Sequence, residues 1–383
     1  MSDPASLHVP FNRPTVAPDQ LAYVTESFSS PKISGDGPFT QRAVRAFREH
    51  LDTDRVLLTP SCTAALEMSG LLLNVGPGDE VIVPSFTFVS SANAYALLGA
   101  RLVFADVDPV DFNIDPDHVR SLMTERTKVV VAVHYGGVAA DVERLSAICA
   151  EFGAALVEDA AHGMFARHDG VPLGRFGALA TFSFHETKNV SCGEGGALVV
   201  NDDALWDRAR IVREKGTDRS RFLDGLVDKY TWVDRGSSYL LADPLAAVLL
   251  AQVEFAAEIQ RRRRHAVQRF HDELSTWAAA NGARMPPRSA TPDSEAAHLF
   301  PLLLPDRSDR DRFLKHTGSC GVSSVFHYLP LHDSPFGARF DGAECPVTTD
   351  VSARLARLPL FSDIGDDEID RVVEAVTSFE AHG

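Results

Sequence analysis

The sequence has 383 residues and 45% hydrophobic content, which is enough for two domains and a sizeable buried core. Its formal net charge of −16 argues against nucleic-acid binding, because such affinity depends on clustered Lys and Arg. The five cysteines lack the spacing of a zinc site, so we expect reduced thiols and no metal site. Neither a signal peptide nor an apolar run of membrane-spanning length is visible, so we expect a cytoplasmic protein without membrane association.

Short apolar runs alternate with helical patterns from about residue 50 to residue 205. The runs are continuous rather than alternating, which is typical of a parallel sheet that helices cover on both faces. Helical patterns such as Ala64–Leu73 and Asp141–Phe152 lie between them. The predicted strands are Val56–Thr59, Glu80–Pro84, Arg101–Asp106, Lys128–His134, Ala154–Glu158, Leu179–Phe184 and Gly196–Asn201.

The pattern changes after residue 205 and predicts a smaller α+β domain. A long helix is expected from Pro244 to about Ala279, connecting the two parts. We therefore predict a large domain over residues 1–245 and a small C-terminal domain over residues 246–383 that includes the connecting helix. The other elements predicted there are a strand at Ala296–Leu304, a helix at Asp309–Thr317, a strand at Ser323–Tyr328 and a helix at Asp366–Ala381.

The first candidate motif is Thr59–Leu66, where a strand leads through small polar residues into a helix. The free N–H groups and the positive dipole end of such a helix can bind a phosphate. Ser61 or Thr63 could instead be a simple N-cap, and for this motif taken alone the N-cap is the favoured interpretation. Phosphate binding and capping use the same geometry, so the motif alone is a weak indication of a phosphate site.

The second motif is Pro84–Ser91, in which two aromatic residues follow a strand end. One of them could stack on a flat ligand, and both could simply be core residues. Without further context the core interpretation is the simpler one.

The third motif is Ala155–His162, an apolar strand that ends in the carboxylates Glu158 and Asp159. An aspartate there is often a helix N-cap. The functional alternative is that Asp159 pairs with the protonated ring nitrogen of a cofactor and makes that ring an electron acceptor.

The fourth motif is Thr181–Asn189, which begins as a strand and ends in a polar loop with Ser183 and Lys188 five residues apart. Most lysines are solvated surface charges. This chain has only six lysines against 31 arginines, however, and Lys188 follows a strand end, where α/β folds bind their ligands. The glycines of Gly193–Gly196 permit close backbone approach beside it.

The order of these four motifs resembles the DegT/DnrJ/EryC/StrS sugar aminotransferases, which are fold-type I enzymes that use pyridoxal phosphate (PLP). The resemblance implies an α/β fold with a mostly parallel seven-stranded sheet in the large domain and a smaller C-terminal α+β domain. Lys229–Asp234 and Gly236–Tyr239 are most similar to the dTDP-4-amino-4,6-dideoxygalactose transaminases within that family. The resemblance covers essentially the whole chain and includes Pro10–Pro14, Ile33–Thr40, Arg213–Arg219 and Arg357–Leu360.

The resemblance implies catalytic roles for Lys188, as Schiff base and proton shuttle, and for Asp159, on the pyridine nitrogen. Phe88 would stack on the cofactor ring, where many relatives have Trp. The residues implied as phosphate ligands are Cys62, Thr63 and Ser183.

Two cofactor contacts depart from the common pattern of the family. His162 stands where many relatives have Gln beside the phenolic oxygen, and it could donate the same hydrogen bond with a charge that depends on pH. Ser238 stands where many relatives have an Asn that reaches the neighbouring subunit's cofactor phosphate. The substrate contacts predicted by resemblance are Lys215, His327 and Tyr328.

The implied function is a transamination from glutamate to C4 of a dTDP-linked 4-keto-6-deoxy sugar, giving a dTDP-4-amino-4,6-dideoxyhexose for antibiotic or cell-surface glycan biosynthesis. A nucleotide-sugar dehydratase is the first alternative, and it ranks lower because that branch has His in place of Lys188. A catalytically inactive scaffold or regulator ranks lower because both Lys188 and Asp159 are present.

The resemblance also implies a homodimer or a larger assembly, with active sites built from both chains. Ile33–Thr40 and Gly236–Tyr239 are the segments expected to cross between subunits. Homodimers are the commonest assembly of soluble proteins, which agrees with this expectation. The expected small-molecule partners are a nucleotide-linked keto sugar and glutamate.

Overall fold

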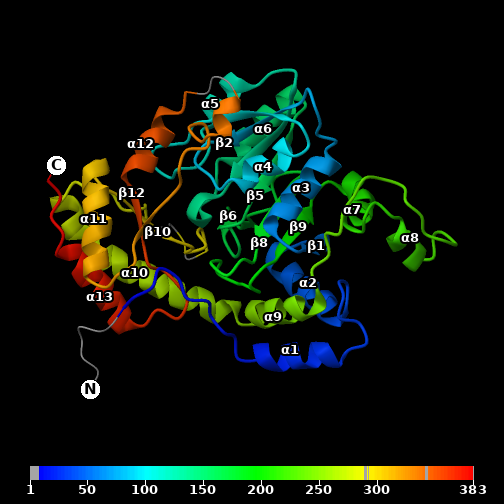
Figure 1. The fold of residues 1–383 in the computed structure, drawn as a ribbon, viewed down its shortest axis with the longest axis horizontal. Helices are drawn as coiled ribbons and strands as arrows, with labels where there is room; N and C mark the ends of the chain where they lie inside the picture. The colour runs from blue at the N-terminus through cyan, green and yellow to red at the C-terminus, as the bar shows by residue number, and fades with distance from the viewer. Residues whose placement is uncertain (1–7, 289–290, 292, 341–343, 383) are drawn as a thin grey trace.

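A seven-stranded sheet forms the centre of the computed structural model, which describes residues 8–288, 291, 293–340 and 344–382 (Figure 1). The strand order is β1-β9-β8-β5-β4-β2-β3, with β9 antiparallel to its neighbours and the remaining pairs parallel. All seven strands match the predicted ones to within one residue at each end, so the mostly parallel sheet is confirmed. The strands are Val56–Thr59 (β1), Glu80–Pro84 (β2), Arg101–Ala105 (β3), Thr127–Val133 (β4), Ala155–Asp159 (β5), Leu179–Ser183 (β8) and Gly196–Val200 (β9).

Helices cover both faces of this sheet, because successive residues of each buried strand point to opposite sides. In β4, Val129 and Val131 pack with α3, α4 and α7, whereas Val130 and Ala132 pack with α5 and α6 on the other face. Both faces are therefore apolar, as the continuous hydrophobic runs predict. The helices of this layer are Pro38–Leu51 (α2), Cys62–Leu72 (α3), Ser90–Ala96 (α4), Pro116–Leu122 (α5), Val142–Phe152 (α6) and Trp206–Arg213 (α7).

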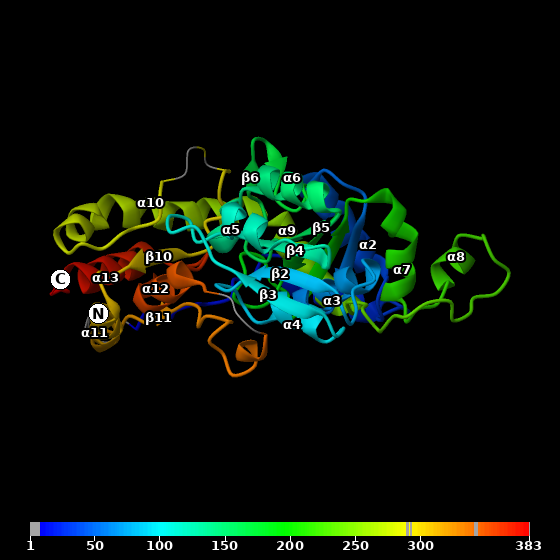
Figure 2. The ribbon, with the colours of Figure 1, turned by 90° about the horizontal axis from the view of Figure 1, so that it is seen from above.

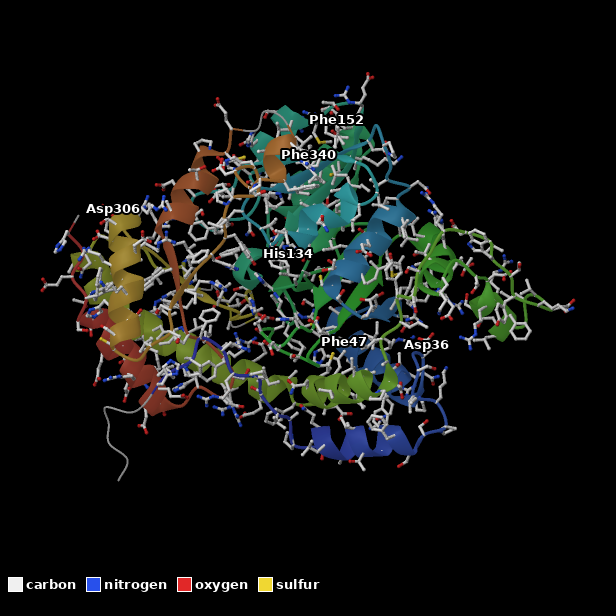
Figure 3. All side chains as sticks on the ribbon, viewed as in Figure 1. Asp36, Phe47, His134, Phe152, Asp306 and Phe340 are labelled. Atoms are coloured by element: carbon white, nitrogen blue, oxygen red, sulfur yellow. The ribbon has the colours of Figure 1, made fainter. Side chains whose placement is uncertain are left out.

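The predicted long helix consists of two helices, α9 (Asp243–Glu254) and α10 (Ala256–Ala280), which meet at Phe255. The two helices serve different cores over most of their length. Apolar residues of α9, together with Ala256 and Ile259 at the start of α10, pack with Phe47 of α2 under the large sheet, whereas the apolar residues of α10 from Ala266 onward belong to the core of the small domain (Figure 3). The chain therefore passes from one core to the other within α10, and the boundary at 245/246 stays a prediction.

The small domain contains a three-stranded antiparallel sheet in the order β10-β12-β11. Its central strand, β12, was not predicted, and the predicted strands at 296–304 and 323–328 are shorter in the structure. Helices α11 and α13 cover this sheet together with α10 (Figure 1). The elements are Phe300–Leu303 (β10), Arg307–Ser319 (α11), Val325–Phe326 (β11), Pro346–Arg354 (α12), Leu355–Leu358 (β12) and Asp366–Thr377 (α13).

The remaining elements lie at the periphery. Helix α8 (Arg219–Leu223) and its flanking loops project at the end of the molecule opposite the small domain (Figures 1 and 2). Helix α1 (Gln20–Ser29) lies beside α9, and strands β6 (Arg167–His168) and β7 (Val171–Pro172) form a short hairpin. In the described part of the chain, no helix is both long enough and apolar enough to span a membrane.

Candidate active site

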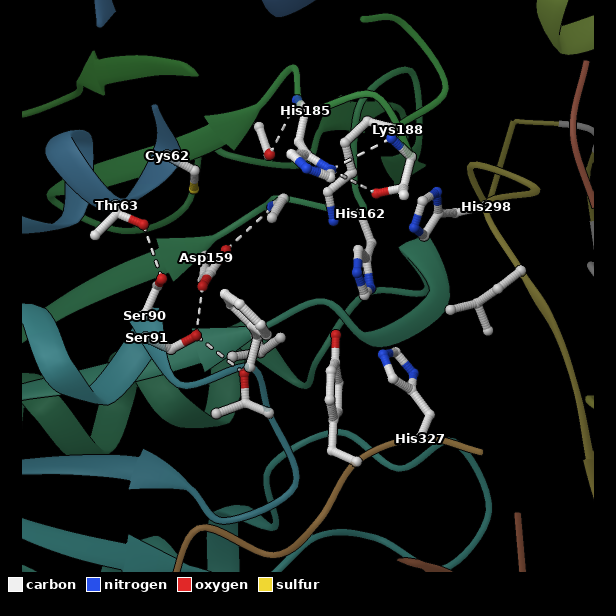
Figure 4. A pocket seen from close by; sticks show the side chains of 18 of the residues that line it. Cys62, Thr63, Ser90, Ser91, Asp159, His162, His185, Lys188, His298 and His327 are labelled. Atoms are coloured by element: carbon white, nitrogen blue, oxygen red, sulfur yellow. Dashed lines mark hydrogen bonds between the residues drawn. The ribbon is translucent and has the colours of Figure 1, made fainter. Parts of the chain in front are cut away.

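A cavity of about 590 Å³ opens between the carboxyl ends of the parallel strands and the small domain. Its volume is in the range usual for ligand pockets, and its position is the one where open α/β sheets bind ligands. Figure 4 shows side chains of the large domain around it, including Cys62, Asp159 and Lys188. The predicted residues that line it are Cys62, Thr63, Phe88, Asp159, His162, Ser183, Lys188, His327 and Tyr328.

Asp159 ends strand β5 and is only 5% exposed. Its Oδ2 accepts a hydrogen bond of 2.7 Å from the Ser91 hydroxyl, and its Oδ1 accepts one of 3.1 Å from the Ala161 N–H. Ser91 is in turn 2.9 Å from the hydroxyl of Thr87. The carboxylate is therefore fixed in one orientation at the cavity wall (Figure 4).

Lys188 lies in the loop that follows β8, and its side chain lines the same cavity. The loop is held by backbone bonds, in which the Lys188 N–H donates to His185 O at 2.9 Å and the Cys192 N–H donates to Phe184 O at 3.0 Å. Burial lowers the pKa of Lys188 to about 8, against the opposing negative charge of Asp159. A substantial fraction of the amine is therefore neutral, and nucleophilic, near pH 8.

The N-terminus of α3 forms the part of the wall that fits a phosphate. The Ser61 side chain accepts from the Ala64 N–H at 3.1 Å, so Ser61 is the N-cap, as one interpretation predicted. The N–H groups of Cys62 and Thr63, in the first turn, have no intrahelical acceptor and remain for a ligand. Capping and anion binding are thus compatible in this turn.

Two further features support the phosphate interpretation of this turn. A Cβ at Gly196 would lie 2.4 Å from the Ser61 carbonyl carbon, so only glycine lets β9 approach the turn this closely. The Thr63 and Ser90 hydroxyls lie 2.8 Å apart beside the turn (Figure 4). Ser183 also lines the cavity. Burial raises the pKa of the Cys62 thiol, which makes that side chain a neutral thiol rather than a nucleophile.

His162 is buried beside Lys188, with its ring centroid 4.2 Å from that of His298. Its Nδ1 accepts a hydrogen bond of 3.3 Å from the Gly136 N–H, so in the neutral ring the proton is on Nε2. Burial, and then the charge of Lys188, hold the pKa of His162 well below its usual value. The histidine is therefore a neutral donor at physiological pH, and its titration lies at lower pH.

The other predicted lining residues come from opposite sides of the cavity. Phe88 follows β2 and is 58% exposed, which leaves an aromatic face free for stacking. His327 and Tyr328 come from the small domain, and His327 Nδ1 is 3.1 Å from the Tyr135 hydroxyl. Ser91 also lines the cavity and was not predicted as a site residue, although it is the last residue of the Pro84–Ser91 motif.

Lys215 and Ser238 are not part of the cavity lining of this chain. The Lys215 N–H donates to the carbonyl of the residue before Ser238, and its Nζ lies 3.3 Å from Glu214 Oε1. Ser238 is exposed and pairs with Glu214 in an isolated bridge. Lys215 and Ser238 of one subunit could line a cavity only in a second subunit, so the predicted substrate and cofactor contacts of these two residues stay predictions.

The donor set of the cavity fits PLP. The free N–H groups at the start of α3 suit a phosphate, the fixed carboxylate of Asp159 suits a protonated ring nitrogen, and the amine of Lys188 suits an aldehyde. Lys188 also has the lowered pKa that imine chemistry requires. The polar groups thus match the three chemically distinct parts of one cofactor.

Residues 14–377 match the DegT/DnrJ/EryC1/StrS aminotransferase family. Three solved structures are similar to this chain over 97% of its length. The aminotransferase TlmJ from Streptoalloteichus hindustanus has 33% identity and a TM-score of 0.88 over 98% of its own chain, and the sugar aminotransferase CalS13 from Micromonospora echinospora has 26% identity and a TM-score of 0.86 over 99% of its own chain. The PLP form of the putative sugar aminotransferase Spr1654 from Streptococcus pneumoniae has 24% identity and a TM-score of 0.88 over 98% of its own chain. The last of these shows the fold alone, because its identity is low. The chain belongs to the DegT/DnrJ/EryC1/StrS aminotransferase family and is a PLP-dependent sugar aminotransferase.

Proposed function

We propose that this enzyme transfers the amino group of glutamate to C4 of a dTDP-linked 4-keto-6-deoxy sugar. The observation that carries the proposal is that Lys188, Asp159 and the start of α3 meet in one cavity. The similarity of Lys229–Asp234 and Gly236–Tyr239 to dTDP-4-amino-4,6-dideoxygalactose transaminases supports the choice of sugar. CalS13, which is 26% identical, is described as a sugar aminotransferase.

In this proposal the cavity binds the cofactor through residues of the large domain. PLP, when bound, supplies a carbonyl that captures amines and a ring that accepts electrons. The amides of Cys62 and Thr63 and the hydroxyl of Ser183 would hold its phosphate, and Phe88 would cover the ring. Asp159, which accepts a hydrogen bond from Ser91, would pair with the ring nitrogen.

The proton transfers fall to Lys188. Its amine would act as both base and acid, taking a proton from the substrate carbon and giving one back during the chemistry that PLP supplies. The lowered pKa of about 8 suits this role, because the amine can both accept and release a proton near neutral pH. His162 would donate from Nε2 to the phenolic oxygen of the cofactor.

A homodimer in the cytoplasm belongs to the same proposal. Apolar side chains are exposed on the projecting segment around α8, including Leu223 at 69% and Trp232 at 77%. Exposed apolar groups of this kind mark protein interfaces. A second subunit covering them could bring Ser238, and with it Lys215, toward the partner's cavity. The five cysteines are all free, as a reducing compartment requires.

The test of this function is a substrate panel. The purified holoenzyme would be incubated with glutamate and with nucleotide-linked 3-keto and 4-keto sugars, and the products identified by NMR. Amination at C4 of a 4-keto-6-deoxy sugar is the expected result. Amination at C3 would contradict the proposed substrate, loss of a hydroxyl without amination would identify a dehydratase, and no spectral change with any amine would indicate a scaffold.

A further inference from the structure

Arg357 is a cation in the small-domain wall of the active-site cavity. It lies in β12, where its neighbours Ala356 and Leu358 pack into the core of the small domain. Strand alternation places the Arg357 side chain on the other face, where it lines the cavity. Its guanidinium carbon lies 4.7 Å from the ring centroid of Phe11.

No acidic side chain in the described part of the chain forms an ion pair with Arg357. Its Nε is buried without a hydrogen-bond partner there, and its Nη2 donates at 3.4 Å to the Phe326 carbonyl. Arg354, three residues earlier, is by contrast paired with Asp350 at 2.6 Å. Arg357 is half-buried in the cavity wall, and its Nε is a buried donor without a partner, so this position suits an anionic ligand.

The charge of Arg357 reaches the reacting amine. Burial is the main cause of the lowered pKa of Lys188, and the like charge of Arg357 adds to it. The same two causes, burial first and then Arg357, lower the pKa of His327. The carboxylates in the lining are Asp159, on the large-domain side at the end of β5, and Glu194, which is exposed. The small-domain side of the cavity therefore attracts anions.

We propose that Arg357 binds the α-carboxylate of the amino donor, an inference that rests on the proposed transamination. In an amino acid the carboxylate is bonded to the same carbon whose proton Lys188 moves, so its anchor must lie beside Lys188. The diphosphate of a nucleotide sugar is several bonds from C4 and does not meet this requirement. The planar fork of Arg357 suits a carboxylate, which it can bind through two parallel hydrogen bonds.

The test compares how three variants react with an amino donor that carries a carboxylate and with one that lacks it. Arg357→Met keeps the packing against Phe11 but removes the charge. Arg357→Lys keeps the charge but loses the planar guanidinium that can form two parallel hydrogen bonds. Arg307→Ala, the control, removes an exposed arginine of the small domain. The holoenzyme would be mixed rapidly with an excess of L-glutamate or of isopropylamine, and the change in cofactor absorbance followed. We expect Arg357→Met to weaken apparent glutamate binding roughly 30-fold or more, with isopropylamine unaffected. Arg357→Lys should be intermediate.

Binding of glutarate to the holoenzyme, measured by calorimetry, provides a readout without turnover. Glutarate carries carboxylates but no amine, and Arg357→Met should lose its binding whereas Arg307→Ala should not. Glutamate conversion and glutarate binding equal to wild type in Arg357→Met would overturn the inference, as would equal losses with glutamate and isopropylamine. A wild-type enzyme that reacts only with other amino acids would refute glutamate as the donor, and the comparison would then use the reacting amino acid. Should no amino acid react, the proposed function fails while glutarate binding still tests Arg357.

Discussion

The Ser91 hydroxyl donates a 2.7 Å hydrogen bond to the Asp159 carboxylate, which joins α4 to the end of β5 inside the cavity. Ser91 itself lies 2.9 Å from Thr87, so the three side chains form a short chain of hydrogen bonds. These hydrogen bonds fix the orientation of the carboxylate at the cavity wall. If Asp159 pairs with the cofactor ring as proposed, Ser91 should affect cofactor binding without touching the substrate.

Ser91→Ala should weaken PLP binding about tenfold, because it removes one of the two donors that orient Asp159 and costs on the order of 1–3 kcal/mol. Titration of the apoenzyme with PLP measures this. Ser69→Ala is a matched control, because Ser69 is also buried and bonds the Tyr95 hydroxyl at 2.8 Å, outside the cavity lining. Equal PLP affinity in Ser91→Ala and wild type would show that Asp159 does not need this support.

The rate at which PLP combines with the apoenzyme should depend on pH through Lys188. Only the neutral amine reacts, and burial lowers the pKa of Lys188 to about 8. Between pH 6 and pH 8 the rate should therefore rise with pH, and above about pH 8 it should level off. A rate that continues to rise toward pH 10 would mean that Lys188 has the pKa of an ordinary exposed lysine.

Gly196→Ala should displace the phosphate-binding turn. The added Cβ would meet the Ser61 carbonyl carbon at 2.4 Å and the Cys62 nitrogen at 2.5 Å, and backbone atoms cannot move aside easily. We expect a loss of about 1–3 kcal/mol in the free energy of unfolding, and weaker PLP binding. Gly318→Ala is the control, since no atom lies within 4 Å of its Cβ. Denaturant unfolding and PLP titration of both variants check this.

His162 should act as a neutral hydrogen-bond donor. Burial holds its pKa well below the usual value, so the histidine should add no titration to the activity profile between pH 6.5 and pH 8. His162→Gln keeps a donor and should retain most of the activity, whereas His162→Ala should lose about tenfold. Profiles of kcat against pH for the three proteins test this, and an activity loss in wild type that follows protonation near pH 6.5 would contradict it.

The exposed apolar residues around α8 should be covered in the assembled enzyme. Trp232→Asp should therefore convert the proposed dimer into monomers, because it introduces a charge into an apolar interface. Size-exclusion chromatography with light scattering measures the mass. Phe152→Asp, at a partly exposed phenylalanine on α6, should leave the dimer intact. A wild-type protein that is monomeric at micromolar concentration would contradict the dimer.

The large sheet was predictable because its strands are buried on both faces and so appear as continuous apolar runs. Asp159 and Lys188 were predictable as candidates because they follow two neighbouring strands, β5 and β8, whose carboxyl ends meet at one edge. The sequence alone left the phosphate turn ambiguous. The structure explains why, because Ser61 caps the helix at Ala64, and the two amides before Ala64 lie in the first turn, where no intrahelical carbonyl is available to them.

The small domain was harder to predict because its elements are short and depend on tertiary contacts. Strand β12 has only four residues, follows α12 directly and contains Arg357, so it lacks an apolar pattern. The break at Phe255 lies inside a continuous helical pattern, and the residues on both sides of it pack into the same core, so the apolar pattern does not mark it. His298 reaches the cavity only through the packing of the two domains.

The central claim, that Lys188 carries the cofactor, is tested most directly by reductive trapping. The holoenzyme would be treated with borohydride, digested, and its peptides analysed by mass spectrometry. The account predicts a reduced pyridoxyl group on Lys188 and on none of the other five lysines, and no such group anywhere in Lys188→Ala. A pyridoxyl group on another lysine, or an unmodified Lys188 in active enzyme, would contradict it.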